Sequence, residues 1–98
     1  RPSRVYLVVS RDGFLAARHS TVMVVPVYSA SHGLETEVTV DETAGLKHAS
    51  ALHCDEVMSL RRTLLRDYVG SLDESRMREV SRALAIALDI APEDIEDL

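Results

Sequence analysis

The fold is decided by two apolar runs, VYLVV at residues 5–9 and TVMVV at residues 21–25. β-Branched and aromatic residues dominate both runs, and such residues favour strands. Because successive residues are apolar, both faces of each run are expected to be buried, which predicts two central strands of a sheet. The turn formers Ser10 and Asp12 follow the first run. The second run ends at Pro26, which has no amide hydrogen to donate to a sheet ladder.

Further strands and a helix are predicted on the C-terminal side of these runs. Residues 35–40 (ETEVTV) alternate polar and apolar, as expected for a strand with one face in solvent. Residues 49–60 form a further predicted strand region, and residues 68–72 (YVGSL) a short closing strand. From Asp73, the expected N-cap, the apolar spacing changes to three and four, which predicts a helix. Its apolar stripe consists of Met77, Val80, Leu84, Ala87 and Leu88.

These elements predict one domain over residues 1–98, mainly β with a C-terminal helix (α+β). Strands are expected within about residues 4–72, the helix over about residues 73–90, and an acidic tail over residues 93–98. The most economical arrangement is one small, strongly curved antiparallel sheet with the helix packed on it.

The composition excludes several classes of protein. The 98 residues are 46% hydrophobic and 28% charged, which is typical of a globular domain and not of a disordered chain. No apolar run approaches the roughly 18 residues of a membrane span, so we expect no membrane partner. The single cysteine, Cys54, cannot form an internal disulfide and fits a cytoplasmic location.

Charge is distributed unevenly along the chain. The net charge is −5, and residues 73–98 account for all of it, with 8 acidic and 3 basic side chains. Residues 1–34, in contrast, carry four arginines against Asp12 alone. The acidic total argues against a general nucleic-acid coat protein, but a local basic face is still able to hold phosphates.

An arginine and two hydroxyl residues at predicted strand ends are candidates for binding a phosphate. Arg4 precedes the first predicted strand, and Tyr28 and Ser29 follow the second. If these strands are antiparallel neighbours, the arginine approaches the hydroxyls, and an arginine with a hydroxyl can clamp a phosphate. The alternative is that Arg4 covers the rim of the sheet and that Ser29 merely begins a loop.

We expect neither a metal nor a cofactor. His48, His53 and Cys54 match no usual zinc spacing, and a strand would place some of these side chains on opposite faces. The glycines are scattered and form no phosphate-binding loop.

Several segments resemble the MazF/PemK toxin family. Residues 4–10 (RVYLVVS) resemble the family strand R-P-V-L-V-V-S, and residues 24–29 (VVPVYS) resemble its V-V-P-V-T-S strand end. Segments similar to the family follow in family order at residues 33–38, 45–47, 50–55 and 69–72, and its terminal helix at 77–84 with 88–90. The resemblance covers nearly the whole chain.

The resemblance implies a toxin of a type II toxin–antitoxin system with an SH3-like barrel of the MazF/PemK/CcdB type. The implied activity is a metal-independent, sequence-specific endoribonuclease, an mRNA interferase, that cleaves single-stranded RNA. The RNA 2′-hydroxyl attacks its own phosphate and leaves 2′,3′-cyclic phosphate and 5′-hydroxyl ends. The implied partners are a cognate MazE-like antitoxin and a second copy of the toxin, as a homodimer. Arg4 aligns with the catalytic arginine of the family, for which charge stabilisation is the physically favoured role.

The chain departs from the family pattern in three places. Tyr28 stands where the family has a catalytic threonine, so the hydroxyl role is expected to pass to Ser29 or to the phenol itself. Val5 replaces a proline after the arginine. The first family strand has no counterpart here, so we expect either residues upstream of Arg1 or a sheet lacking one barrel strand.

Polar residues in predicted loops are the candidates for RNA contacts, because binding residues concentrate in loops. They are Ser10, Arg11, Arg18, His19, Ser31 and His32. His19 or His32 is also a candidate proton carrier. A second basic group, Arg61, Arg62 and Arg66, is a candidate for lining a dimer groove or for binding the acidic segment of an antitoxin.

Two other functions remain open from the sequence. CcdB toxins share the fold and act by binding DNA gyrase, which would make the chain a protein-binding toxin. A catalytically inactive SH3-like interaction module is the second alternative, favoured by Tyr28 and by the missing strand.

Overall fold

The computed structural model of the chain describes residues 4–94. Its strands and α-helices are β1 (Val5–Val8), α1 (Asp12–Ala16), β2 (Thr21–Tyr28), β3 (Glu37–Val40), β4 (Ser50–His53), β5 (Met58–Arg61) and α2 (Glu74–Ala87). Short 3-10 turns lie at η1 (Glu42–Ala44), η2 (Cys54–Glu56), η3 (Arg62–Leu64) and η4 (Pro92–Asp94). The predicted class, mainly β with a C-terminal helix, is confirmed. Of the predicted acidic tail, residues 95–98 lie outside the described part of the chain.

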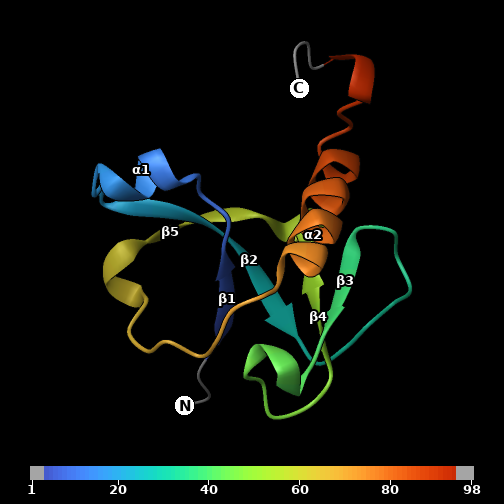
Figure 1. Cartoon of the computed structure of the whole chain (residues 1–98), viewed down its shortest axis with the longest axis horizontal. Coiled ribbons are helices and arrows are strands. Elements are labelled where there is room, and N and C mark those ends of the chain that lie inside the picture. Colours follow the sequence, from blue (N-terminus) through green and yellow to red (C-terminus); the bar gives the residue numbers. More distant parts are fainter. Residues whose placement is uncertain (1–3, 95–98) are drawn as a thin grey trace.

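The eight-residue strand β2 is the centre of the sheet (Figure 1). β1 runs antiparallel along one edge of β2, with Val5 opposite Val27. Two strands share the other edge: β5 pairs with residues 21–24 of β2, and β4 pairs with residues 27–28. β3 then pairs with the far edge of β4. Every one of these pairings is antiparallel.

Strand β2 is buried on both faces, as its apolar sequence predicts. Val24 and Val25 are consecutive, so their side chains point to opposite faces, and both are fully buried. Val25 packs in a cluster with Val80 of α2, while Val24 packs in a second cluster with Leu60 of β5. The prediction of a central strand at residues 21–25 is therefore confirmed.

Strand β1 is an edge strand, so the prediction of a second central strand is wrong. Within residues 4–94, β1 pairs with β2 and with no other strand. Val8 at its end is 36% exposed. The described sheet is open at β1 and does not close into a barrel. An apolar run predicts burial, but it does not show whether a second strand covers the free edge.

Several elements differ from the predicted ones. Strand β2 continues through Pro26 to Tyr28, and β3 begins at Glu37. The strand region at residues 49–60 is interrupted by η2, where the chain passes from the β4 half to the β5 half of the β2 edge. The predicted loop after β1 contains the short helix α1. Residues 68–72 form no strand, and their backbone instead packs at Gly70 against that of Gly45, whose φ is a left-handed +93°.

Helix α2 begins where its cap predicts and ends at Ala87, three residues before the predicted end. The Asp73 carboxylate accepts a hydrogen bond from the backbone N–H of Arg76 at 2.8 Å. Val80 and Ala83 face the sheet and are buried. None of the helices in residues 4–94 combines the length and the apolar character that crossing a bilayer requires.

Candidate functional site

The register of β1 and β2 places Arg4 beside the C-terminal end of β2. Val5 lies opposite Val27, so Arg4, one residue earlier, lies next to Tyr28, one residue later. The Cζ atom of Arg4 lies 5.7 Å from the centroid of the Tyr28 ring, a cation–π distance. Arg4 is exposed, so its guanidinium is accessible to a charged ligand.

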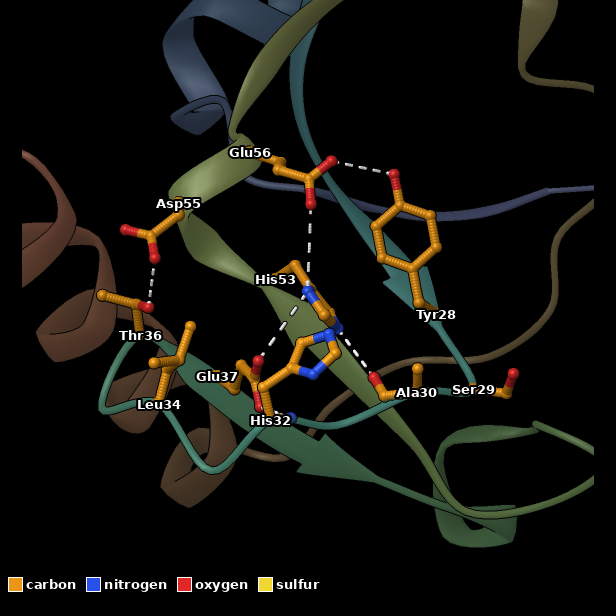
Figure 2. Close-up of a pocket in the computed structure, with 10 residues that line it drawn as sticks. All are labelled: Tyr28, Ser29, Ala30, His32, Leu34, Thr36, Glu37, His53, Asp55 and Glu56. Carbon is orange, nitrogen blue, oxygen red and sulfur yellow. Dashed lines mark hydrogen bonds and ion pairs between the residues drawn. The ribbon is translucent and has the colours of Figure 1, made fainter.

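A cavity of about 390 Å³ that contains several polar side chains is lined by Tyr28 (Figure 2). The end of β2, the loop that leads to β3, and the corner between β4 and η2 form its walls. The lining residues are Tyr28, Ser29, Ala30, His32, Leu34, Thr36, Glu37, His53, Asp55 and Glu56. The cavity thus brings together three of the predicted catalytic or RNA-binding residues, Tyr28, Ser29 and His32.

The two candidate hydroxyls point in different directions. The Tyr28 hydroxyl is directed at Glu56, whereas the Ser29 hydroxyl points away from His53, on the outer side of the chain (Figure 2). Tyr28 and Ser29 are consecutive residues at a strand end, where side chains alternate between faces. Their hydroxyls therefore lie on different sides of the end of β2.

The Tyr28 phenol is a hydrogen-bond donor. Its hydroxyl donates to Oε1 of Glu56 at 3.0 Å. This hydrogen bond, followed by desolvation and the negative charge of Glu56, raises the pKa of Tyr28 above its ordinary value, and the positive charge of Arg4 opposes that rise. The phenol therefore stays protonated at neutral pH, which suits it to donate a hydrogen bond and not to act as a base.

Glu37 of β3 organises the loop between β2 and β3. Its Oε1 accepts hydrogen bonds from the Ser31 hydroxyl at 3.0 Å and from the backbone N–H groups of His32 and Gly33 at 2.9 and 3.1 Å. Burial alone raises the pKa of Glu37, but the hydrogen bonds from His32 and Ser31 and the nearby His53 together hold it below its ordinary value. Two of the predicted RNA-binding residues, Ser31 and His32, are thus held in place by an ionised carboxylate.

His53 lies at the centre of the cavity. The sequence suggested it only as a possible metal ligand and predicted no metal site. Its Nε2 lies 2.9 Å from the carbonyl oxygen of Ala30, and its Nδ1 lies 3.9 Å from a carboxylate oxygen of each of Glu37 and Glu56. The ring also packs edge-on against Tyr28, with centroids 4.8 Å apart. The available sequence signal was a histidine inside the buried run ALHC, followed three residues later by a glutamate.

The other predicted RNA-binding residues lie at the opposite end of β2 (Figure 1). The Ser10 hydroxyl accepts a hydrogen bond from the Met23 backbone N–H at 2.7 Å. The rings of Phe14 and His19 stack with centroids 4.2 Å apart, and Arg11 lies over the Phe14 ring. Arg18, also at this end, has a left-handed φ of 55°. In this single chain, Ser10, Arg11, Arg18 and His19 form a group separate from Arg4 and Tyr28.

The three arginines of the second basic group, Arg61, Arg62 and Arg66, make different contacts. Arg62 donates hydrogen bonds to the carbonyl oxygens of His19, at 2.9 Å, and Leu15, at 3.4 Å, so it supports the turn after α1. Arg61 pairs with Thr21 in the sheet register. Arg66 lines a second hollow of about 560 Å³ between β1 and residues 64–72, which Arg4 also lines. Arg4 therefore lines this hollow, and its contact with the Tyr28 ring connects it to the cavity that Tyr28 lines.

The residues considered for metal binding do not converge. Across residues 4–94, no three His, Cys, Asp or Glu side chains are grouped so as to hold a metal ion. His48 is exposed in the loop before β4, whereas Cys54 is fully buried. Burial, with a smaller contribution from Asp55, raises the pKa of the Cys54 thiol to about 11, so it stays protonated in the core.

Known structures share this architecture. The Mycobacterium tuberculosis toxin MazF-mt6 aligns with a TM-score of 0.83 at 28% identity, over 90% of this chain and 88% of that one. A second M. tuberculosis toxin structure aligns with a TM-score of 0.80 at 28% identity, over 87% of this chain and 92% of that one. A MazE–MazF structure from Deinococcus radiodurans aligns with a TM-score of 0.74 at 22% identity, over 90% and 87% of the two chains, and so supports the fold alone.

Sequence comparison gives the same family by a separate route. Curated protein sequences give no match to the chain. The family model of PemK-like, MazF-like toxins of type II toxin–antitoxin systems matches residues 1–88, most of the chain. With this match and with the similarity to known toxin structures, the chain belongs to the PemK-like, MazF-like toxin family.

Proposed function

We propose that the chain is a metal-independent, sequence-specific endoribonuclease that cleaves single-stranded RNA. The observation that carries the proposal is the position of the Arg4 guanidinium over the ring of Tyr28, which lines the cavity together with Ser29. A guanidinium binds two phosphate oxygens at once, and a neighbouring hydroxyl supplies a further donor. Single-stranded RNA suits such a site, because its unstacked bases expose the edges that carry sequence information.

The proposed reaction uses the substrate's own 2′-hydroxyl as the nucleophile. The 2′-oxygen bonds to phosphorus, the bond from phosphorus to the 5′-oxygen breaks, the 2′-hydroxyl loses a proton and the leaving oxygen gains one. The products are a 2′,3′-cyclic phosphate and a 5′-hydroxyl. Arg4 stabilises the negative charge of the crowded phosphorane, since a guanidinium does not lose its proton at neutral pH.

Tyr28 and Ser29 are the proposed hydroxyl groups of the site. Tyr28 has the position of the family threonine, and its raised pKa keeps its hydroxyl protonated. The hydroxyl has one hydrogen, so donation to a phosphate oxygen would replace its hydrogen bond to Glu56. Ser29 is exposed next to it and offers a second hydroxyl from another direction. His32, exposed in the same loop, is a proposed RNA contact and candidate proton carrier with Ser31 beside it.

The group Ser10, Arg11, Arg18 and His19 is proposed to bind RNA farther along the strand. The two ends of β2 are roughly 23 Å apart, at about 3.3 Å per residue. An RNA single strand that follows β2 would meet both groups. His19 is less suited than His32 to carry a proton at Arg4, because it lies at the distant end and stacks on Phe14.

The proposed partners follow from charge and from the family. A MazE-like antitoxin with an acidic segment would compete with RNA for the exposed arginines, Arg4 among them. A homodimer is the proposed assembly, and the cytoplasm, where RNA and antitoxin are both present, is the proposed location. Arg61 and Arg66 are proposed contacts for the antitoxin or for a dimer groove.

The test is incubation of the purified protein with a long single-stranded RNA in EDTA, followed by mapping and chemical analysis of the new ends. We expect discrete cuts at a short recurrent sequence, with 2′,3′-cyclic phosphate and 5′-hydroxyl ends. Intact RNA would contradict the proposal and would favour a CcdB-like toxin that binds DNA gyrase, or an inactive interaction module. Cuts that appear only when Mg²⁺ is supplied would contradict the metal-independent mechanism.

A further inference from the structure

His53 contacts every element that forms the cavity. Its side chain is 10% exposed and extends from β4 between Glu37 of β3 and Glu56 of η2. The rings of Tyr28 and His32 lie edge-on to it, at centroid distances of 4.8 and 6.0 Å (Figure 2).

The contact to Ala30 fixes one nitrogen of the His53 ring. Nε2 lies 2.9 Å from the Ala30 carbonyl oxygen, and a carbonyl oxygen accepts hydrogen bonds only. Nε2 must therefore carry a hydrogen and donate it. If the ring is neutral, the remaining nitrogen, Nδ1, has a lone pair and no hydrogen.

Nδ1 faces negative charge on two sides. Oε2 of Glu37 and Oε2 of Glu56 each lie 3.9 Å from it. The Glu37 side chain is 4% exposed, and its buried Oε2 has no hydrogen-bond partner among residues 4–94, whereas its Oε1 accepts three hydrogen bonds. An unpaired carboxylate oxygen in the interior is costly, and a lone pair directed at it adds repulsion. A proton on Nδ1 replaces the repulsion by attraction to both carboxylates, at an ion-pair distance of 3.9 Å.

The same ring supports both candidate hydroxyl residues. Glu56, drawn toward His53 through Oε2, accepts the Tyr28 hydroxyl through Oε1. Ala30, held through its carbonyl oxygen, directly follows Ser29 and so fixes the backbone on which the serine stands. Asp55, the remaining acidic residue of the cavity, accepts a hydrogen bond from the Thr36 hydroxyl at 2.6 Å.

We propose that His53 is a positioning residue that acts in its protonated form, clamped between Glu37 and Glu56, and that it orients Tyr28 and Ser29 for RNA cleavage. The proposal rests on the endoribonuclease function and adds a pH dependence to it. When His53 loses its proton, Nδ1 repels both carboxylates, so Glu56 is released and Tyr28 loses its fixed direction. Cleavage therefore declines at alkaline pH, where the positive charge between the two carboxylates is lost.

The test compares His53→Gln with His48→Gln, an exposed histidine outside the cavity. Glutamine still donates to Ala30 but carries no positive charge. We expect His53→Gln to lower kcat by about 100-fold, since small displacements of reacting groups have effects of this size, with little change in KM. The alkaline limb of the pH profile should disappear in this variant and should persist in His48→Gln. Thermal melting of both variants separates this result from unfolding.

A second variant keeps the test decisive if His53→Gln folds poorly. Glu37→Gln retains an oxygen to accept the three loop hydrogen bonds but removes the charge that favours the imidazolium. The alkaline limb should therefore move to lower pH. A wild-type kcat and pH profile in folded His53→Gln, or an unmoved limb in Glu37→Gln, would overturn the proposal.

A measurement without RNA separates this proposal from the proposed function. Nitrogen-15 NMR of the histidine rings, with His53 assigned by its absence from His53→Gln, reports whether Nδ1 carries a hydrogen at neutral pH. We expect both His53 nitrogens to be protonated. An unprotonated Nδ1 would overturn the inference even if RNA is cleaved. If the wild-type protein cleaves no RNA, the endoribonuclease function and the positioning role in cleavage both fail. The NMR result still shows whether His53 is protonated between Glu37 and Glu56.

Discussion

Arg4→Ala is expected to lower kcat/KM for RNA cleavage by about 100- to 1,000-fold, the usual effect of removing one preorganised group that stabilises transition-state charge. Arg4 is exposed and its guanidinium lies over the Tyr28 ring, so its removal takes away the positive charge at the proposed phosphate site with little effect on the core. Arg4→Lys should recover only part of the rate, because an ammonium lacks the planar fork that binds two oxygens. Initial rates on an oligonucleotide that contains a mapped cut site measure both effects.

Arg78→Ala is the matched control for this prediction. Arg78 is an exposed arginine of α2 whose nearest acidic group, Glu74, lies at 4.0 Å. Its removal changes the net charge by the same amount but leaves the cavity intact, so cleavage should be unchanged. Cleavage by Arg4→Ala at the rate of Arg78→Ala would exclude a catalytic role for Arg4.

Gly70→Ala is expected to lower the free energy of unfolding by about 1–3 kcal/mol, the usual cost of forcing an extra group into a packed region. A Cβ on Gly70 would lie 2.8 Å from the carbonyl carbon of Ala44 and would collide with its oxygen. These are backbone atoms, so no side-chain rotation relieves the overlap. Gly45, which follows Ala44 and also contacts Gly70, has a left-handed φ of 93°.

Gly13→Ala is the control for the effect of adding a methyl group. A Cβ at Gly13 would have no heavy atom within 4 Å, and the residue lies inside α1. Alanine is the better helix former, so this variant should be as stable as the wild type or more stable by up to about 1 kcal/mol. Thermal melting resolves the difference, since 1 kcal/mol moves the Tm of a domain of this size by about 4–8 °C. Equal melting temperatures for Gly70→Ala and Gly13→Ala would show that the contact at Ala44 is not tight.

The sequence predicts best those elements whose burial or ends follow from the local pattern of residues. The run at residues 21–25 is apolar on both faces, and β2 is indeed buried on both sides between Val80 and Leu60. Helix α2 was predictable because Asp73 caps it and its apolar residues are regularly spaced. The approach of Arg4 to Tyr28 was also predictable, since antiparallel pairing brings the start of one strand to the end of the next.

Features that depend on distant segments were not predictable in the same way. Strand β1 has the same apolar pattern as β2, but within residues 4–94 it pairs with β2 alone. An apolar pattern does not specify whether a strand has a second neighbour. Residues 68–72 read as a strand, yet their place is set by the contact between Gly45 and Gly70. His53, Glu37 and Glu56 meet only after β3, β4 and η2 are assembled, so no spacing in the sequence indicated their cluster.

The most direct test of the central claim uses two oligonucleotides that contain the mapped cut site. One is all RNA, and its twin lacks only the 2′-hydroxyl of the nucleotide on the 5′ side of the cut. With EDTA present, we predict that the protein cuts the RNA to 2′,3′-cyclic phosphate and 5′-hydroxyl ends and leaves the twin intact, because the twin lacks the nucleophile. Cleavage of the twin at the same bond would show that another group, such as water, attacks the phosphate, and would contradict the account.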